Sequence, residues 1–596
     1  MLSPEDMLSV CVSYLTCTTA TPPPYASNGK RLPFFLAAAR SIPVILRDVK
    51  DTSNDSFMFD SCLIKHLFDA VEDLFITDHD GAHFIHFAAY NDLCHVIRHI
   101  ISRDPSLVNS RTKDRYTPLT YAVLSGSKKA VETLLITHGV DVNLRDRDGR
   151  TPVSYAAELG DEDILKLLLA IDGVLVDSRD EHGRTPLSYA ASSASRSAFP
   201  ILTAILSKDV DVNSRDKNGR TPLSYAASSL SDSAHAIVET LLSMKDIDVH
   251  SKDCDDRTAL SYAASSESRS MFCVVKTFLC CEGILVSVQS KDKNGRTPLS
   301  YAASSGSYSE ASVVESLLAV SEFEAYLKDK QGRIPLSYAV TSCSPSALYT
   351  VIALLAVEGT DINSRDEHGR TPLSYAASST SHSAYSIVQA LLGTTRVIDV
   401  NSKDGAGRTA LSYAMSSTSY YASSIIEALL SVKDIDVHSR DRSGRDALSY
   451  AASSWSNCIS SSIKVLLAIE GIDINSKDEC GRSPLSYAAS SRSMSADSTI
   501  GALLSAEGID VNSRDNTGRT PLFYAVESTS HYAVSIIKTL LATDNINVIL
   551  TDHEDRSPFF YAISDHIQQL LLEVAKAQGC VDLGETSFQK LYLGCV

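Results

Sequence analysis

The side chains best suited to binding a metal ion lie between residues 79 and 99. His95 and His99 stand four residues apart on an expected helix, which would bring both imidazoles to one face. The candidate ligands are Cys94, His95 and His99, with His79, His83 and His86 upstream. Zinc prefers thiolate and imidazole ligands, so a zinc site is one hypothesis. The alternative is a polar helix face, and we predict this alternative, with no metal and no cofactor.

Catalysis by side chains is not indicated. No Ser/His/Asp or Cys/His combination stands apart from a repeated pattern, and the Asp, Ser and Arg residues of interest recur along the chain. A catalytic group is usually singular, whereas a structural residue recurs with its unit. Cys280-Cys281 stands at the end of an expected helix, where other units carry Leu-Leu or Leu-Ser, and we interpret it as packing. We therefore predict that the protein is not an enzyme.

One heptapeptide accounts for most of the recurring residues. Thr-Pro-Leu-Ser-Tyr-Ala-Ala, preceded by Asp-x-x-Gly-Arg, stands at Thr185–Ala191, Thr221–Ala227, Thr297–Ala303 and Thr371–Ala377. Its tyrosine recurs every 34 to 39 residues, most often every 37, at Tyr121, Tyr155, Tyr189, Tyr225, Tyr262, Tyr301, Tyr338, Tyr375, Tyr413, Tyr450, Tyr487, Tyr524 and Tyr561. A fixed period in this range predicts a solenoid of stacked units.

The unit around Tyr375 predicts the local structure of all of them. Residues 366–369 indicate a turn with a positive φ at its glycine. Thr371-Pro372 supplies a helix N-cap and a proline at the first helical position. The first helix follows, residues 378–383 connect it to a second helix that begins near residue 384, and residues 399–402 return in an extended conformation.

These residues resemble the ankyrin repeat. The family pattern is Asp-x-x-Gly-x-Thr-Pro-Leu-His-x-Ala-Ala, followed by a second helix ending in Leu-Leu and by Asp-Val-Asn, which stands here at Asp211–Asn213 and Asp510–Asn512. The resemblance implies an all-α ankyrin solenoid with short β-turn fingers. If His86, within Ile85-His86-Phe87-Ala88-Ala89, is the family histidine of the first unit, the array has about 14 helix–loop–helix units.

Two features differ from the family pattern. The histidine is replaced by Ser188, Ser224 or Ser374, so its hydrogen bonds to the backbone of the turn are lost or replaced. The period exceeds the family's length of about 33 residues. Most added residues fall in Ser-rich connections, at Ser192–Ser197, Ser228–Ser233 and Ser378–Ser383. We expect these connections to be mobile, to lie outside the core and to be accessible to phosphorylation.

The repeat divides the chain into three expected parts. These are an irregular helical N-terminal cap (1–77), the ankyrin array (78–572), and a C-terminal cap and tail (573–596). The segments Cys11–Leu15 and Pro33–Ala38 resemble the helical region that links NACHT ATPase domains to ankyrin arrays in fungal NLR-like proteins. Ile42 and Pro43 lie where that family has Trp and His. The sequence has no Gly-x-x-x-x-Gly-Lys-Ser/Thr motif, so the resemblance implies an array without the ATPase.

Composition limits the classes of partner and compartment. The net charge of −18 is spread along the chain and argues against nucleic-acid binding, which needs a concentrated basic surface. The 13 cysteines share no spacing, which indicates free thiols in a reducing compartment. Glu5 and Asp6 argue against a signal peptide, and no apolar run approaches the roughly 20 residues that span a membrane. We expect a monomer in the cytoplasm, with the nucleus as the alternative.

Charged residues flank every turn. A basic residue precedes the turn aspartate, as in Arg179-Asp180 and Arg365-Asp366, and an arginine follows the glycine, as in Arg184. We expect these ladders to neutralise one another between neighbouring units at the surface, where each pair contributes about 0.2–1 kcal/mol.

The turn tips vary between units, and in the ankyrin family such fingertips contact partners. The candidate partner-binding residues are therefore Glu181, His182, Lys217, Asn218, Lys330, Gln331, Glu367, His368 and Arg442, together with Trp455, the single tryptophan, on a connecting loop. We predict a protein–protein interaction scaffold or adaptor. One alternative is a sensor or regulatory arm of an NLR-like system that works with a separate ATPase. Another is a recruiting subunit of an enzyme complex.

Overall fold

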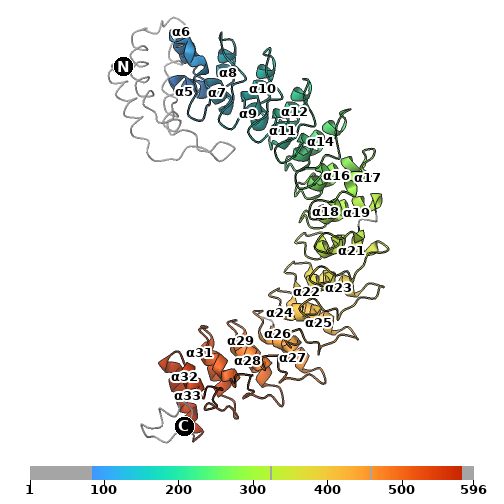
Figure 1. The fold of residues 1–596 in the computed structure, drawn as a ribbon, viewed down its shortest axis with the longest axis vertical. Helices are drawn as coiled ribbons and strands as arrows, with labels where there is room; N and C mark the ends of the chain where they lie inside the picture. The colour runs from blue at the N-terminus through green and yellow to red at the C-terminus, as the bar shows by residue number, and fades with distance from the viewer. Residues whose placement is uncertain (1–82, 322–324, 457–458, 580–596) are drawn as a thin grey trace, which may run out of the picture. The chain divides into compact units, whose positions relative to one another are not determined.

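A computed structural model describes residues 83–321, 325–456 and 459–579 of the chain (Figure 1). These residues form helices joined by turns, and the extended backbone among them pairs in one isolated bridge, between Lys252 and Thr258. The chain divides into two compact units, unit 1 up to Ser287 and unit 2 from Val288. Each unit is described by itself.

The described part of unit 1, from residue 83, contains six helix pairs. The first helices are α5 (Phe84–Tyr90), α7 (Pro118–Leu124), α9 (Pro152–Leu159), α11 (Pro186–Ser192), α13 (Pro222–Ala227) and α15 (Ala259–Ala264). The second helices are α6 (Cys94–Arg103), α8 (Lys128–Leu135), α10 (Glu162–Leu169), α12 (Ala198–Leu206), α14 (Ala234–Leu242) and α16 (Met271–Leu279). A 3-10 helix, η1 (Pro105–Asn109), follows α6, and the short α17 (Leu285–Val288) lies at the division between the units.

Eight helix pairs lie in the described residues of unit 2. The first helices are α18 (Pro298–Ala302), α20 (Pro335–Ala339), α22 (Pro372–Ser378), α24 (Ala410–Ser416), α26 (Ala447–Ala452), α28 (Pro484–Ala489), α30 (Pro521–Val526) and α32 (Pro558–Tyr561). The second helices are α19 (Glu310–Val320), α21 (Ala347–Ala356), α23 (Ala384–Leu392), α25 (Ala422–Leu430), α27 (Ile459–Leu467), α29 (Ala496–Leu504), α31 (Ala533–Leu541) and α33 (Asp565–Ala577). The prediction of an all-α repeat with about 14 units is confirmed.

Within each unit the helices form two layers. A first helix packs against the first helices before and after it, as α24 does against α22 and α26, and the second helices stack in the same way. The core between the layers consists of the heptapeptide leucine and alanines together with aliphatic residues of the second helix, as in Leu373, Ala376, Ile387 and Leu391. Since each pair buries its apolar faces against its neighbours, the stability of the array is close to a sum of local and nearest-neighbour terms.

The predicted helix boundaries agree with the structure in the unit around Tyr375. Thr371 is the N-cap of α22, and its hydroxyl accepts a hydrogen bond from the backbone N–H of Ser374 at 3.3 Å. The second helix begins at Ala384, as expected. The expectation of an extended return over residues 399–402 is wrong, because Val400 and Asn401 form a turn. Asp399 Oδ1 accepts from the N–H of Asn401 at 3.2 Å, which is the local bonding that favours turns at aspartate.

The expectation that the Ser-rich connections lie outside the core is wrong. They follow a Ser-x-Ser-x-Ser pattern in which alternate serines are buried, as Ser491, Ser493 and Ser495 are in the loop between α28 and α29. The first two of these hydroxyls each accept from the backbone N–H two residues later, for example Ser493 Oγ from Ser495 N at 3.2 Å. Ser495 Oγ also donates to the carbonyl of Ser456 in the preceding loop at 2.9 Å, so these loops pack against one another.

The expected C-terminal boundary of the array, at residue 572, lies within the described residues and can be compared with the helices there. The last described helix, α33, runs from Asp565 to Ala577 and crosses the expected boundary at residue 572. The expected N-terminal cap, with the segments Cys11–Leu15 and Pro33–Ala38, lies outside the described residues.

Candidate partner-binding surface

The backbone of each finger turn is held by an aspartate. In the turn before α22, Asp366 Oδ1 accepts from the backbone N–H of His368 at 2.9 Å and of Arg370 at 2.7 Å. Consecutive turns are joined by a backbone hydrogen bond, since Glu367 N donates to Gln331 O at 2.7 Å and Gly405 N donates to His368 O at 2.6 Å. The fingers of unit 2 are therefore linked into one row with fixed backbones.

Glycine stands at most positions where neighbouring fingers approach, and Arg115, Asp256 and Asp555 take the same left-handed conformation in the remaining turns. Gly407 has a φ of +84°, a left-handed conformation that favours glycine, and a Cβ at this position would lie 2.8 Å from the backbone nitrogen of Arg442. Gly149 occupies the same place in unit 1, with a Cβ position 2.8 Å from the backbone nitrogen of Glu181. At these two glycines the close contact between fingers therefore depends on the absence of a side chain.

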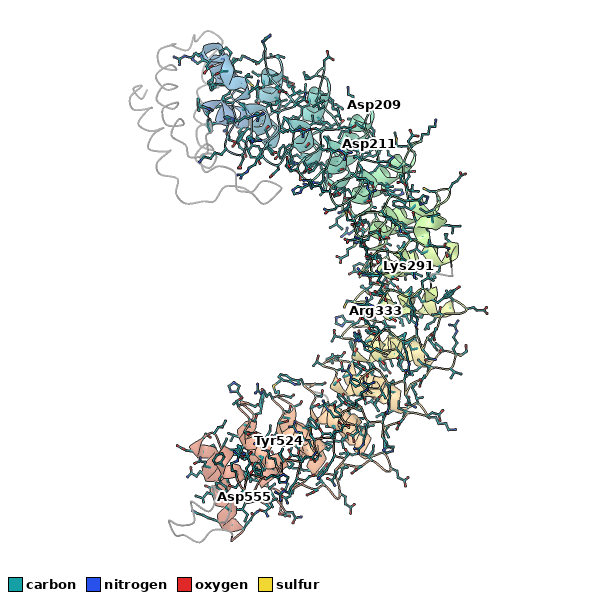
Figure 2. The ribbon with its side chains drawn as sticks, in the orientation of Figure 1. Asp209, Asp211, Lys291, Arg333, Tyr524 and Asp555 are labelled. Carbon is teal, nitrogen blue, oxygen red and sulfur yellow. The ribbon has the colours of Figure 1, made fainter. Side chains whose placement is uncertain are left out.

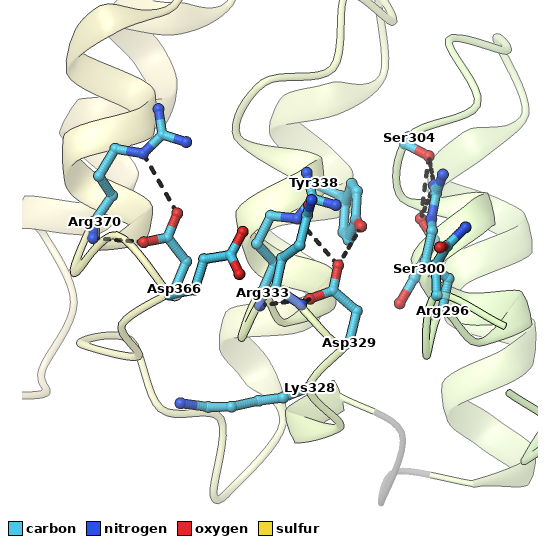
Figure 3. Close-up of polar contacts among 12 residues, drawn as sticks. Arg296, Ser300, Ser304, Lys328, Asp329, Arg333, Tyr338, Asp366 and Arg370 are labelled. Atoms are coloured by element: carbon cyan, nitrogen blue, oxygen red, sulfur yellow. Dashed lines mark hydrogen bonds and ion pairs between the residues drawn. The ribbon is translucent and has the colours of Figure 1, made fainter. Parts of the chain in front are cut away.

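The heptapeptide tyrosine ties its helix to the finger (Figure 3). The hydroxyl of Tyr338 donates to Asp329 Oδ2 at 2.6 Å, and Nε of Arg333 reaches the same oxygen at 3.0 Å. The corresponding tyrosine–aspartate bond is present in every described repeat from Tyr155 to Tyr561. Figure 2 marks Arg333 and Tyr524, two members of this set from different repeats of unit 2.

The arginine after the turn glycine lies against tyrosines of two repeats. The guanidinium of Arg296 lies 4.1 Å from the ring centre of Tyr301 in its own repeat and 4.5 Å from that of Tyr338 in the next. Its Nη2 also donates to Ser304 Oγ at 2.7 Å, at the start of the connecting loop. In unit 1, Arg150 lies between Tyr155 and Tyr189 in the same way. Cation–π contacts of this kind each contribute about 0.5–2 kcal/mol, more when the cation is desolvated.

These contacts correct the expected role of the charged ladders. The aspartate is buried and its arginine partner comes from the same turn, so the pair is not an exposed one between neighbouring repeats; the side chain of Asp366 is 2% exposed. The basic residue before the aspartate instead donates to a backbone carbonyl of the next repeat, as Lys403 Nζ does to Arg440 O at 3.1 Å. Lys477 repeats this with Arg514 O at 2.8 Å. The basic residue before the aspartate therefore joins neighbouring repeats through a hydrogen bond to the backbone. The arginine after the glycine joins them through its contacts with two tyrosines.

The electrostatics of the network follow from burial and hydrogen bonding. Burial alone would raise the pKa of Asp366, but the hydroxyl of Tyr375, the backbone N–H groups of Arg370 and His368 and the Arg370 cation outweigh it and lower the pKa. Burial, followed by the hydrogen bond to Asp366, raises the pKa of Tyr375 to about 12. The aspartate is therefore charged and the tyrosine neutral at neutral pH, and neither group is poised to exchange protons in catalysis.

All ten candidate partner-binding residues are exposed. Nine of them lie at finger tips, as predicted: Glu181, His182, Lys217 and Asn218 in unit 1, and Lys330, Gln331, Glu367, His368 and Arg442 in unit 2. Trp455 is 63% exposed and lies on the loop after α26, whereas the finger of the same repeat, with Arg442, precedes that helix. The structure therefore groups the fingertips and leaves Trp455 on a second edge.

That second edge carries exposed apolar residues that sequence reasoning missed. Tyr308, Tyr420 and Met494 occupy outward positions of the Ser-x-Ser-x-Ser loops in unit 2, and Tyr420 is 86% exposed. In unit 1, Leu230 is exposed at the outward position that Trp455 has in its own loop. The alternation of serine with varying residues is a period of two, which predicts one inward and one outward face. This signal was present in the sequence.

The candidate metal ligands are not assembled into a site in the described residues, which contain no group of three or more side chains able to hold a metal ion. His86 is buried and structural, with Nε2 3.1 Å from Ser110 O and 3.2 Å from Tyr116 O. Burial lowers its pKa to about 4, so it is neutral. His79 and the side chain of His95 lie outside the described part of the chain. Cys280 is exposed and Cys281 half-buried, so the interpretation of this pair as packing is wrong for Cys280.

Where the ankyrin pattern has histidine, this chain has a serine that hydrogen-bonds only within the first turn of its own helix. Ser188 is buried, its N–H donates to the N-cap oxygen of Thr185 at 3.4 Å, and the two hydroxyls lie 3.3 Å apart. His86 bridges to two backbone carbonyls further along the chain, whereas Ser188 satisfies only the start of its own helix. The repeats with this serine, from Ser154 to Ser486, also have the tyrosine–aspartate bond, which ties the helix to the turn.

Comparison with known proteins places the chain in a family. The ankyrin repeat model, described as "Ankyrin repeats (3 copies)", matches residues 57–146, 133–216, 193–274, 260–353, 307–404, 343–441, 381–478, 418–515 and 448–552. The chain therefore belongs to the ankyrin repeat family. Ankyrin repeats generally mediate protein–protein interactions, and proteins of this family are typically non-enzymatic scaffolds.

A similar solved structure is the crystal structure of EF0377, an ankyrin repeat protein. It is 22% identical, with a TM-score of 0.30, and the match covers 33% of this chain and 96% of that one. No curated protein matches the chain. Among the described helices, none has the length and apolar character needed to cross a membrane.

Proposed function

We propose that this protein is a scaffold or adaptor that binds a macromolecular partner, a protein, along its row of finger turns. The observation that carries the proposal is the contrast between fixed and varying positions in each finger. The aspartate, glycine and arginine hold the backbone of most turns, while the tip side chains are exposed and differ from repeat to repeat. Pre-organised backbones with varied side chains lower the entropic cost of binding.

The fingertip charges are mixed, which favours a partner with a patterned surface over a uniformly charged polymer. In unit 2 the tips present Lys330, then Glu367 and His368, then Arg442. A nucleic acid would require a concentrated basic surface, and such alternation does not supply one. The proposal therefore retains a protein partner, with no nucleic-acid or membrane ligand.

We place this function in a reducing compartment, the cytoplasm or alternatively the nucleus, with the protein acting as a monomer. The support is that the described cysteines are free thiols: Cys94, Cys254, Cys273, Cys280, Cys281, Cys343 and Cys480. Disulfides persist chiefly in oxidising compartments, so unpaired exposed cysteines suit a reducing one.

The test is partner capture with two matched variants of the full chain. One variant replaces four fingertips, Lys330→Ala, Gln331→Ala, Glu367→Ala and His368→Ala. The control replaces four exposed residues of second helices, Glu315→Ala, Glu427→Ala, Lys464→Ala and Lys538→Ala. We expect proteins retained by the wild type to be lost with the fingertip variant and kept with the control. Equal retention by both variants would contradict the proposal.

The identity of the captured protein also separates the more specific roles. A nucleotide-binding ATPase supports the sensor or regulatory arm of an NLR-like system. A catalytic subunit supports the recruiting role in an enzyme complex. Capture of a partner of neither kind would support the scaffold role and neither of the more specific roles.

A further inference from the structure

One buried carboxyl group in unit 2 has no counterpart in the other repeats. Glu310 is the first residue of α19, and it is 0% exposed. In the nine other second helices from α12 to α31 the first residue is apolar and buried: Ala198, Ala234, Met271, Ala347, Ala384, Ala422, Ile459, Ala496 and Ala533. A carboxyl group therefore occupies a place built for a methyl group or an aliphatic chain.

The group lies at the contact between two neighbouring repeats. Its Oε2 accepts a hydrogen bond from the hydroxyl of Ser342, in the loop before α21, at 2.8 Å. Its Oε1 is buried without a hydrogen-bond partner. Burying a charged oxygen without a partner is strongly unfavourable, whereas a protonated carboxyl group is much less so.

The nearby hydroxyls have other hydrogen-bond partners. Ser344 Oγ donates to Ser307 O at 2.7 Å, across the same contact, and Thr350 Oγ1 donates to Ser346 O at 3.4 Å. Ionised Glu310 would compete for these hydrogens, because a carboxylate only accepts. The Ser344–Ser307 bond between the two loops would be weakened as a result.

No cation is placed to neutralise Glu310 in the described surroundings. On the elements packed around it, Tyr308, Glu315, Cys343 and Tyr349 are exposed. Tyr301 and Tyr338 donate their hydroxyls to Asp292 and Asp329 of the finger turns. Arg296, which reaches the start of the loop, is bonded to Ser300 and Ser304.

We propose that the protonation state of Glu310 controls the contact between the loop at residues 304–309 and the loop at residues 341–346. With Glu310 protonated, the two loops stay packed. With Glu310 ionised, the carboxylate draws in water or competing donors, and the contact opens locally.

The direction of the pH effect follows from linkage. Burial, opposed chiefly by the hydrogen bond from Ser342, raises the pKa of Glu310 from 4.5 to about 7. Between these two values the folded form binds more protons than the unfolded form, so stability falls as the pH rises. The loss is complete a little above pH 7, and it corresponds to a rise in the opening equilibrium constant on the order of 100-fold.

The experiment is hydrogen exchange of the full chain at pH 5.5 and pH 8.0, corrected for intrinsic exchange rates. In the wild type we expect amides of residues 304–310 and 341–347 to lose protection at the higher pH, while those of the loop at 491–495 change little. Glu310→Ala introduces the residue found at most equivalent positions and should show no pH-dependent loss. Glu310→Gln keeps the shape without titrating and should behave the same way.

A matched control is Glu315→Gln, one turn along α19 on its exposed face, which should retain the wild-type response. Equal protection of the wild type at both pH values would overturn the proposal. So would an unchanged pH response in both Glu310→Ala and Glu310→Gln. Binding of a partner to the fingertips does not enter any of these measurements, so the outcome is independent of the proposed function.

Discussion

The finger turns and the connecting loops lie at opposite ends of each first helix. Both hold their backbone in a fixed conformation, but with different side chains. Both alternate a fixed, buried polar residue with varying exposed residues. In the fingers the fixed residue is an aspartate that gathers backbone N–H groups, a tyrosine and an arginine. In the loops it is a serine that binds the N–H two residues later. A rigid backbone that displays variable side chains can therefore rest on charged or on neutral groups.

The difference between the two is one of strength. Hydrogen bonds to a charged group contribute about 1.5–3 kcal/mol, against about 1 kcal/mol for a neutral pair. The finger network also spans two repeats, because its arginine lies against tyrosines of both, as Arg445 does with Tyr450 and Tyr487. We therefore expect the finger row to be the stronger of the two edges, and the following tests start from the largest expected effect.

The largest effect is expected from Asp366→Ala. It leaves the N–H groups of His368 and Arg370 and the hydroxyl of Tyr375 without their acceptor. We expect a loss of about 3 kcal/mol in the free energy of local unfolding, measured by denaturant-dependent hydrogen exchange. The control, Glu367→Ala at the exposed neighbouring position, should change it by less than about 0.5 kcal/mol. Equal effects of the two substitutions would show that the aspartate does not hold the turn.

Lowering the pH should destabilise the finger turns more than the serine loops in the wild-type protein. Asp366, Asp404, Asp515 and Asp552 have pKa values below 3.8, because hydrogen bonds outweigh the opposing effect of burial. Their contribution to stability is present above pH 3.8 and is lost as the pH falls through their folded pKa values. Hydrogen exchange at pH 5 and pH 2.5 should therefore show the fingers losing more protection than the serine loops. Greater loss in the loops would reverse the comparison.

A smaller effect is expected from Ser493→Ala. Its hydroxyl is buried and accepts from the N–H of Ser495 at 3.2 Å. Removing this acceptor should lower the local stability by about 1 kcal/mol, measured by exchange of the loop amides. The adjacent Arg492→Ala, at an exposed position, is the control and should have little effect. If the serine substitution is silent, the loops are not packed as described.

The smallest effect on stability is expected from Trp455→Ala, because the ring is 63% exposed. The change in thermal unfolding should correspond to less than about 0.5 kcal/mol. Partner capture with this variant then sharpens the comparison. Loss of the captured protein would mean that the loop edge also binds, and full retention would confine binding to the fingers.

Much of the fold could be predicted because its determinants are local. Thr371 and Pro372 begin a helix through capping and a preset φ, and Gly369 supplies a positive φ of 78° within its own turn. The regular spacing of Tyr375 and its counterparts gives the length of the repeat, and a fixed repeat length predicts stacked units. Exposure of the fingertips follows as well, since they lie at the tips of turns whose glycines approach the next backbone closely.

What only the tertiary structure decided depends on the neighbouring repeat. The burial of Ser493, the position of Arg296 between two tyrosines and the orphaned oxygen of Glu310 all arise where two repeats meet. The sequence places a serine, an arginine and a glutamate at their positions in the unit, but whether water or protein surrounds them is a property of the stack. The energy of a polar side chain changes by several kcal/mol between those two surroundings, and only the packed structure determines which one it has.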